Sequence, residues 1–204
     1  MNIEELWNNY HSVKNKSALS GCGYDETIDF LQVRPYCIPG NHALEIGVGL
    51  GYVTKGFKDN GLMVSALEIS KVGLDRVKNY CEFLFTPADL EKIPSNYFDC
   101  IICHNVMQHV PTDMLVNELK HCIRSLKSDG VFAIEFVSMI GIPGDSWNSS
   151  YVYAGSDLPG FYREPKYFEE MINTLGGNCK MVVDNRYENG IKGCPVSHIT
   201  RIVN

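Results

Sequence analysis

The sequence predicts a single α/β domain with a parallel central sheet and helices on both of its faces. From about residue 42 onward, apolar strand-like runs alternate with helical patterns, an alternation typical of strand–helix–strand units. A glycine-rich turn directly follows the first of these runs. A chain of 204 residues is long enough for one such domain and too short for two of ordinary size.

Each predicted element follows from its own residue pattern. In the last of the three central helices, Leu115, Leu119 and Cys122 fall on one stripe at helical spacing. Ser70 and Thr112 are expected as N-caps, because their hydroxyls can accept hydrogen bonds from free amides of the first turn. Strands are expected at 42–46, 63–68, 82–86, 98–103 and 131–137, with helices between them at 51–59, 71–80 and 113–126.

The two ends of the chain differ from this middle part. Residues 1–40 are expected to form an N-terminal helical cap segment on a domain that spans 41–204. The stretch 138–164 is rich in Gly, Ser, Asn and aromatic residues, and its length predicts a lid-like insertion. A helix at 165–175 and two strands at 181–187 and 197–203, expected to pair antiparallel, close the chain.

Composition and charge narrow the classes of function. The net charge of −6 provides no basic surface for phosphate backbones, which disfavours nucleic acid as a partner. The first residues lack the basic start and apolar core of a secretory signal. The longest apolar stretch is too short to span a bilayer. We therefore expect a cytoplasmic protein without a membrane segment.

The chain has eight cysteines, yet only Cys100 and Cys103 have the spacing of metal ligands. Both lie on a predicted strand, where residues three apart point to opposite faces. Two thiolates on opposite faces cannot share one zinc ion without a bend. We expect no metal site, and interpret the cysteines as small buried apolar side chains.

The glycine-rich turn is the most informative segment of the sequence. A buried strand contains Glu45, and Gly47, Gly49 and Gly51 then alternate before a helix begins. Glycine lets the main chain turn sharply and lets a ligand approach it closely. The spacing does not complete the G-x-G-x-x-G pattern of dinucleotide-binding turns, and the lysine of a P-loop is missing.

Two acidic residues at later strand ends indicate a nucleoside ligand. Glu68 ends the second predicted strand, where a carboxylate can accept hydrogen bonds from both ribose hydroxyls. Asp89 follows the third strand, where it can accept from an adenine amino group while Leu90 packs or donates its amide. The set contains no phosphate clamp.

This ordered set resembles the class I S-adenosylmethionine-dependent methyltransferases. The E-x-G-x-G-x-G turn, the acid that ends the second strand and the Ala-Asp-Leu triplet at 88–90 match three family motifs in order and spacing. Tyr97-Phe98-Asp99 and the turn at 126–130 match two more, so the resemblance covers roughly residues 40–137. It implies a Rossmann-like, seven-stranded, mostly parallel sheet whose last strand is inserted antiparallel. It also implies S-adenosylmethionine as cofactor and S-adenosylhomocysteine as product.

The resemblance assigns a role to each donor-site residue. The glycine turn passes beneath the methionine part of the donor, and Glu45 orients that turn. Glu68 binds the ribose, Asp89 with Leu90 binds the adenine, and His104 contacts the methionine end through its main chain. The predicted cofactor-binding residues are Glu45, Gly47, Gly49, Gly51, Glu68, Ile69, Ala88, Asp89, Leu90 and His104.

The acceptor segment, residues 103–111, determines where the methyl group is expected to go. It lacks the Asp/Asn-Pro-Pro-Tyr/Phe tetrapeptide with which DNA and RNA amino-methyltransferases grip a base. It resembles small-molecule methyltransferases such as the phosphoethanolamine methyltransferases, in which a histidine lies beside the acceptor. His109 matches that histidine, and Asn105 matches a position that faces the site. A histidine suits a general base, although packing at the start of the next helix is an alternative for His109.

Acceptor recognition is expected from the variable parts of the chain. Arg163 can pair with a phosphate or carboxylate of a substrate. The leading hypothesis is in-line methyl transfer to an O or N atom of a small polar metabolite, with His109 as catalytic base. A protein or RNA methyltransferase, and a catalytically silent partner subunit that binds S-adenosylmethionine, stay open, as does a homodimer. The predicted substrate-binding residues are Tyr10, Tyr24, Asn105, Trp147, Tyr151 and Arg163.

Overall fold

The structure is a computed structural model that describes residues 2–12, 23–139, 161, 163, 165–183 and 195–203. The α-helices of this part are α1 (Ile3–Ser12), α2 (Tyr24–Phe30), α3 (Tyr52–Asp59), α4 (Lys71–Val77), α5 (Thr112–Ser125) and α6 (Pro165–Thr174). The strands are β1 (His42–Ile46), β2 (Met63–Leu67), β3 (Cys81–Phe85), β4 (Phe98–Cys103), β5 (Leu126–Met139), β6 (Asn178–Val183) and β7 (Pro195–Val203). Short 3₁₀ helices are η1 (Arg34–Tyr36), η2 (Pro87–Lys92) and η3 (Met107–His109).

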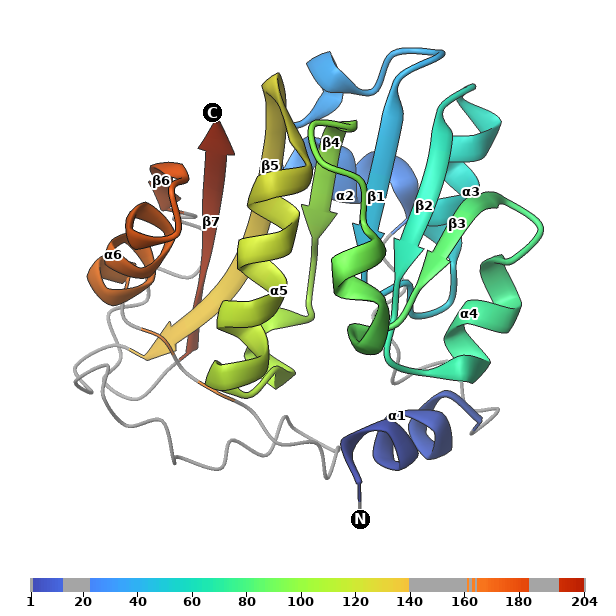
Figure 1. Cartoon of the computed structure of the whole chain (residues 1–204), viewed down its shortest axis with the longest axis horizontal. Coiled ribbons are helices and arrows are strands. Elements are labelled where there is room, and N and C mark those ends of the chain that lie inside the picture. Colours follow the sequence, from blue (N-terminus) through green and yellow to red (C-terminus); the bar gives the residue numbers. More distant parts are fainter. Residues whose placement is uncertain are drawn as a thin grey trace.

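One sheet joins the described strands in the order β3-β2-β1-β4-β5-β7-β6 (Figure 1). The pairs within β3-β2-β1-β4-β5 are all parallel, which confirms the predicted Rossmann-like α/β class with its parallel sheet. β7 pairs antiparallel with both β5 and β6. The last two strands begin at residues 178 and 195, earlier than the predicted 181 and 197.

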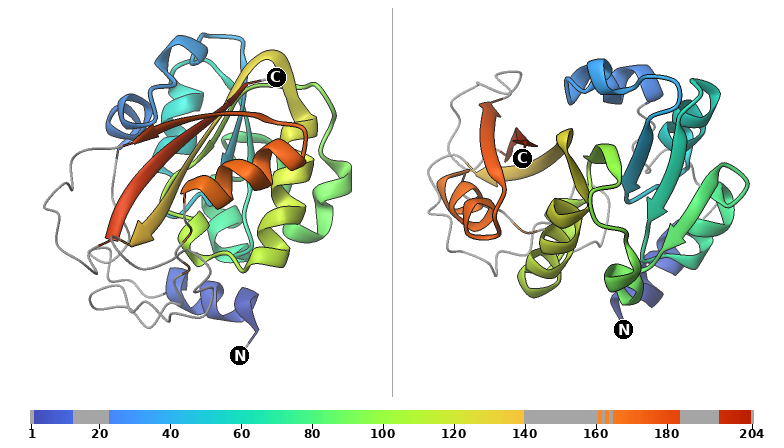
Figure 2. Two further views of the ribbon diagram at one scale, coloured as in Figure 1. Left: turned by 90° about the vertical axis from the view of Figure 1, so that its left-hand side faces the viewer. Right: turned by 45° about the horizontal axis from the view of Figure 1, so that its top comes forward.

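Helices cover both faces of the sheet (Figures 1 and 2). On one face α5 and α6 pack on alternate strand residues such as Ile101 and Cys103. On the other face α2 and α3 pack on the residues between them, such as Cys100 and Ile102. Side chains alternate in this way along any strand, and burial on both faces makes the parallel strands apolar throughout. The prediction that Cys100 and Cys103 point to opposite faces is therefore confirmed.

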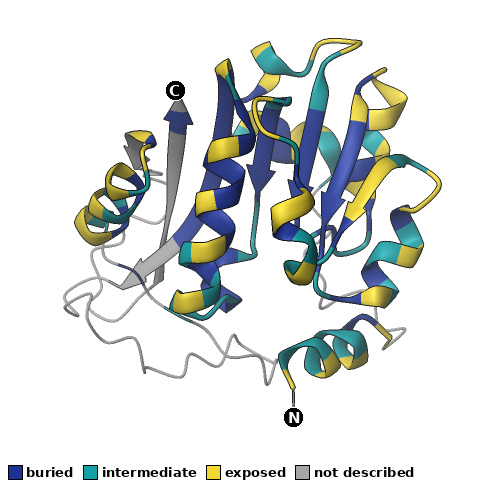
Figure 3. Cartoon of the chain, viewed as in Figure 1, coloured by how far each residue is buried: buried dark blue, intermediate teal, exposed yellow. Residues whose placement is uncertain are grey.

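Burial falls off at the β3 edge of the sheet (Figure 3). β1, β2 and β4 are buried along most of their length. None of the helices in the described part of the chain has both the length and the apolar character needed to cross a bilayer.

Asp99 connects the beginnings of three parallel strands. Its Oδ2 accepts a hydrogen bond from the His42 main-chain amide at 2.8 Å. Lys127 Nζ donates to the same carboxylate at 2.8 and 2.9 Å. These contacts tie β4 to β1 and β5 and accompany a register in which Cys103 lies level with Ile46 and Ile134. The loops that follow β1 and β4 therefore start at the same height.

The two predicted N-caps differ in outcome. The Ser70 hydroxyl accepts a hydrogen bond from the Gly73 amide at 3.2 Å, so its capping role is confirmed. The prediction for Thr112 is wrong. α5 already begins at Thr112, and Pro111 stands at the N-cap position without a side-chain hydrogen bond.

Replacement of Leu119 by alanine should lower the free energy of unfolding by about 2–5 kcal/mol, because it leaves a cavity in the α5 face of the core. Leu84→Ala is the matched control, since Leu84 lies on the edge strand with 39% of its surface exposed. Urea unfolding followed by circular dichroism measures both. Equal losses for the two variants would contradict the assigned packing.

Candidate functional site

The candidate site lies where the carboxyl ends of β1, β2 and β4 meet, the edge at which open α/β sheets bind ligands. The glycine turn, residues 47–51, follows β1 there. Gly47, Gly49 and Gly51 have φ angles of 75°, 52° and 79°, in the left-handed region that glycine adopts without strain. Figure 1 shows α1 lying beyond these carboxyl ends.

The space beside Gly47 is filled, whereas the space beside Gly49 is open. A Cβ atom on Gly47 would lie 2.2 Å from Cγ2 of Val106, a residue of the acceptor segment. A Cβ atom on Gly49 would meet nothing within 4 Å. The turn is therefore packed against the acceptor segment at Gly47 and open at Gly49, where a ligand can approach the main chain.

Glu45 is buried at the end of β1, and the Thr54 hydroxyl of α3 donates a hydrogen bond to its carboxyl group. Burial raises the pKa of Glu45 to about 8. The hydrogen bond connects the strand before the glycine turn to the helix after it. This geometry supports the predicted role of Glu45 in orienting the turn.

Glu68 is buried just after β2 and faces the glycine turn. The Ser70 amide donates to Glu68 Oε1 at 2.8 Å, and the main-chain amides of Val48, Gly49 and Ile69 lie near its carboxyl group. Burial raises the pKa of Glu68, and these main-chain amides oppose the rise. The carboxyl group thus joins the loops that follow β1 and β2.

Asp89 serves as a local cap in η2. Its Oδ2 accepts from the Thr86 amide at 3.0 Å and from the Thr86 hydroxyl at 2.6 Å. Lys92 Nζ donates to its Oδ1 at 2.6 Å, and the ion pair with Lys92, followed by the bonds from Thr86, lowers the pKa of Asp89. Leu90 is buried in the core, Ala88 is exposed, and Ile69 beside Glu68 is half-buried. Binding of adenine by this segment stays a prediction.

His104 and Asn105 form a polar network at the ends of β4 and β5. His104 Nδ1 lies 3.3 Å from the Thr27 hydroxyl, and its Nε2 lies 3.3 Å from the buried carboxylate of Glu135. The Asn105 amide donates to the same carboxylate at 2.9 Å, and Asn105 has a φ of 58°. Glu135 thus holds the first turn of the acceptor segment. Sequence reasoning assigned it no role, although a charged residue in an apolar strand was a usable signal.

His109 is buried in η3, directly beneath α1. Its ring lies edge-on to Trp7, with ring centroids 5.3 Å apart. Trp7 in turn contacts Tyr10, with ring centroids 5.4 Å apart. The structure thus brings Tyr10 and His109, predicted for acceptor binding and catalysis, into one aromatic cluster through Trp7.

The prediction that Arg163 binds a substrate is wrong. Its guanidinium is buried and donates hydrogen bonds to the main-chain carbonyls of Met107 and Val110. The Phe161 amide also donates to the Gln108 carbonyl. Arg163 therefore stabilises η3 and the residue after it, because it binds the main-chain carbonyls of Met107 and Val110.

The prediction for Tyr24 also needs correction. Its ring lies edge-on to Phe57 of α3, with centroids 5.4 Å apart, and it fills the space beside Gly56. Tyr24 therefore packs between α2 and α3, in place of the predicted contact with a substrate. Trp147, Tyr151 and nearly all of the predicted insertion 138–164 lie outside the described residues.

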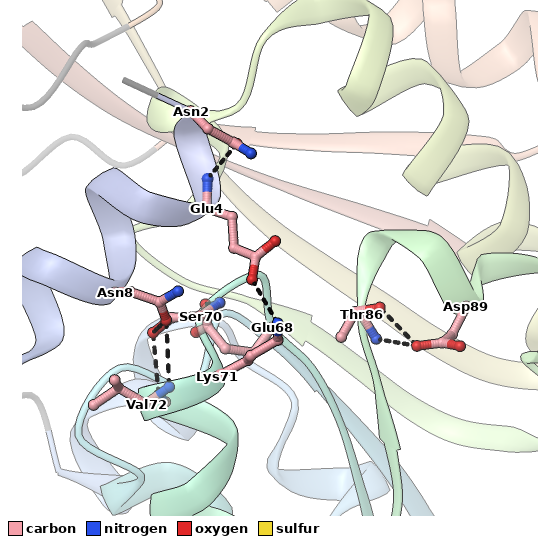
Figure 4. Close-up of polar contacts among 10 residues, drawn as sticks. Asn2, Glu4, Asn8, Glu68, Ser70, Lys71, Val72, Thr86 and Asp89 are labelled. Carbon is pink, nitrogen blue, oxygen red and sulfur yellow. Dashed lines mark hydrogen bonds and ion pairs between the residues drawn. The ribbon is translucent and has the colours of Figure 1, made fainter.

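Polar contacts fasten α1 to the donor side of the site (Figure 4). Asn8 Oδ1 accepts from the Ser70 hydroxyl at 3.0 Å and from the Val72 amide at 3.4 Å. Lys71 forms an ion pair with Glu4 at 3.2 Å. Sequence reasoning missed these contacts, because the residues in each pair lie more than 60 positions apart.

Arg76 of α4 connects α1 to the glycine turn. Its Nη1 donates to the Gly49 carbonyl at 2.9 Å, and its Nη2 donates to the carbonyl of His11 in the last turn of α1. A single guanidinium thus spans the two segments. No local sequence pattern indicated this role.

We expect Gly47→Ala to reduce the free energy of unfolding more than Gly49→Ala. A left-handed φ destabilises both alanine variants by about 1–2 kcal/mol, but only the alanine at position 47 contacts Val106. The double variant Gly47→Ala/Val106→Ala should recover part of the loss, because it removes the nearest atoms. Thermal unfolding of the four proteins, wild type included, measures this. Equal losses in the single variants would show that Gly47 does not contact the acceptor segment.

Glu118 of α5 is a buried carboxyl group that sequence reasoning also missed. Burial, followed by the charge of Glu68, raises the pKa of Glu118 from 4.5 to about 7. Between these values the folded state holds a proton that the unfolded state has lost, so stability falls as pH rises through this window. Glu118→Gln should therefore lose less stability than wild type between pH 5 and pH 8 in urea unfolding. The exposed Glu170→Gln is the control. A wild-type pH slope in Glu118→Gln would contradict this pKa.

Comparison with known proteins agrees with this geometry. Residues 44–134 match a family model described as a methyltransferase domain. A ubiquinone biosynthesis O-methyltransferase from Coxiella burnetii is 26% identical over 100 residues, which cover 46% of this chain and 42% of the relative. The match thus spans less than half the length of this curated relative.

Solved structures share the fold. Phosphoethanolamine N-methyltransferase 2 from Haemonchus contortus, in complex with phosphomonomethylethanolamine and S-adenosylhomocysteine, aligns with a TM-score of 0.69 at 14% identity, over 89% of this chain and 53% of that chain. An S-adenosylmethionine-dependent methyltransferase from Mesorhizobium loti aligns with a TM-score of 0.64 at 13% identity, over 89% of this chain and 100% of that chain.

The donor site fits S-adenosylmethionine. Open space at Gly49 leaves room above the turn, and Glu68 supplies a buried acceptor at the end of β2. The match of residues 44–134 includes both positions. Residues 44–134 thus resemble a methyltransferase domain, and the fold is shared with solved S-adenosylmethionine-dependent methyltransferases.

Proposed function

We propose that this protein transfers the methyl group of S-adenosylmethionine to an O or N atom of a small polar metabolite, by in-line displacement with His109 as base. One observation carries the proposal. Val106 packs directly on Gly47, so the acceptor segment touches the turn beneath the donor. The acceptor histidine follows Val106 by three residues, and its amide donates to the Val106 carbonyl at 2.8 Å.

The donor side needs main-chain and carboxyl groups. When bound, S-adenosylmethionine supplies an electrophilic methyl group on a sulfonium centre. Glu68 accepts from the ribose, the segment 88–90 holds the adenine, and the glycine turn lies under the methionine part. Alignment of this kind can provide several kcal/mol, up to about 7–11 in ideal intramolecular cases.

The acceptor side depends on His109. Its ring is buried beneath Trp7, so it can take a proton from an acceptor hydroxyl or ammonium group without competition from bulk water. A positioned base of this kind contributes roughly 10²–10⁴-fold to a rate. Asn105 and Tyr10 stay proposed acceptor contacts, together with the untested Trp147 and Tyr151.

Two observations support a small acceptor. The net charge of −6 disfavours a polynucleotide. The Haemonchus contortus structure holds a small phospho-amine, and the Coxiella burnetii relative is an O-methyltransferase of ubiquinone biosynthesis. Helix α1 covers the site, which supports residues 1–40 as a cap on a domain spanning 41–204.

Radiolabelled methyl transfer from S-adenosylmethionine into metabolite, protein and RNA fractions tests the proposal. We expect label in the small-molecule fraction. Once an acceptor is isolated, His109→Ala should slow single-turnover transfer by about 10²–10⁴-fold. His42→Ala is the control, because His42 lies at the opposite end of β1.

The alternatives give different results. Label confined to protein or RNA would overturn the small acceptor. Donor binding without transfer into any fraction would indicate a catalytically silent partner subunit. An unchanged rate in His109→Ala would end the role of His109 as base.

A further inference from the structure

His11 of α1 is a buried histidine with an unsatisfied ring atom. Only 4% of its surface is exposed, and its Nδ1 has no hydrogen-bond partner. Leaving a buried polar atom unpaired costs about 1–3 kcal/mol, so such an atom in a native structure calls for an explanation. The sequence pattern around His11 indicates no role for it.

The Arg76 guanidinium group links His11 to the glycine turn. Arg76 donates one hydrogen bond to the His11 carbonyl and another to the Gly49 carbonyl. The space that faces Gly49 is open, since a Cβ atom there would meet nothing within 4 Å. The main-chain carbonyl of His11 is therefore separated by one guanidinium group from the part of the turn that a ligand can approach.

Aromatic rings surround the imidazole on its own helix. The Trp7 ring centroid lies 5.6 Å away and the Tyr10 ring centroid 6.0 Å away. Burial, followed by the charge of Arg76, lowers the pKa of His11 to about 4. The ring is therefore neutral at pH 7, with one nitrogen that carries a hydrogen and one that can accept.

We propose that His11 is a donor-binding residue, and that its Nδ1–H donates a hydrogen bond to the α-carboxylate of S-adenosylmethionine. The proposal rests on the proposed function. A carboxylate is favoured over the donor's ammonium group because Arg76, the charged side chain that contacts both segments, attracts an anion and repels a cation. The bond satisfies the unpaired nitrogen, and docking of α1 then completes the donor site.

Calorimetry with two ligands that share an adenosine tests this assignment. S-adenosylhomocysteine carries the amino-acid part, whereas 5′-methylthioadenosine lacks it. His11→Phe keeps an aromatic ring of similar shape and removes both nitrogens. We expect this variant to bind S-adenosylhomocysteine about 10-fold or more weakly, as for a lost hydrogen bond to a charged group, and to bind 5′-methylthioadenosine like wild type. His121→Phe, a change at a buried histidine of α5, is the control.

Decarboxylated S-adenosylmethionine separates the carboxylate from the rest of the amino-acid part. We expect wild type and His11→Phe to bind it equally. Thermal unfolding checks that the variants fold. His11→Asn restores a side-chain hydrogen-bond donor at this position.

Three results would overturn the proposal. Equal affinity of wild type and His11→Phe for S-adenosylhomocysteine would remove the contact. An equal loss for S-adenosylhomocysteine and 5′-methylthioadenosine would show that His11 only holds α1 in place. Failure of wild type to bind either ligand would instead overturn the proposed function, and this inference with it.

Discussion

The carboxyl group of Glu68 is the interaction on which the rest of the site depends. It accepts a hydrogen bond from the Ser70 amide in the segment that leads into α4, and main-chain amides of the glycine turn lie near it and lower its pKa. A hydrogen bond to a charged group contributes about 1.5–3 kcal/mol, and it offsets part of the cost of burying a carboxyl group. Ser70, whose amide binds Glu68, donates a hydrogen bond from its hydroxyl to Asn8 Oδ1 and so positions α1. The donor turn and the cap thus share one anchor.

Two buried charged side chains hold the acceptor segment on the opposite side of the site. Glu135 fixes the left-handed turn at Asn105, and Arg163 binds the carbonyls of η3. Both side chains are buried and bind main chain, so the acceptor segment takes its shape before any ligand arrives. The contact of Val106 with Gly47 then sets the distance between donor turn and acceptor segment.

Local patterns predicted the donor side well. β1 and β4 have the predicted bounds, because each is a short apolar run between turn residues. Glu45, the glycines and Glu68 lie at one edge, since strand ends in a parallel sheet converge wherever the loops are short. These features depend on neighbours within a few residues, which a sequence displays directly.

The contacts missed or misassigned are long-range. Arg163 lies 56 residues from Met107, and Thr27 lies 77 residues from His104. An arginine in a loop predicts a solvent-facing charge, and nothing nearby in the sequence indicates that it binds main-chain carbonyls of a distant segment. Tyr24 likewise fills space beside Gly56, a packing match that becomes visible only in three dimensions.

Calorimetric titration of S-adenosylhomocysteine into wild type and Glu68→Ala measures whether the Glu68 carboxyl group organises a donor site. We expect saturable binding at one site in wild type and a loss of affinity of about 10-fold or more in the variant. Glu170→Gln on exposed α6 should bind like wild type. Wild-type affinity in Glu68→Ala, or no binding by wild type, would contradict the claim that this carboxyl group organises a donor site.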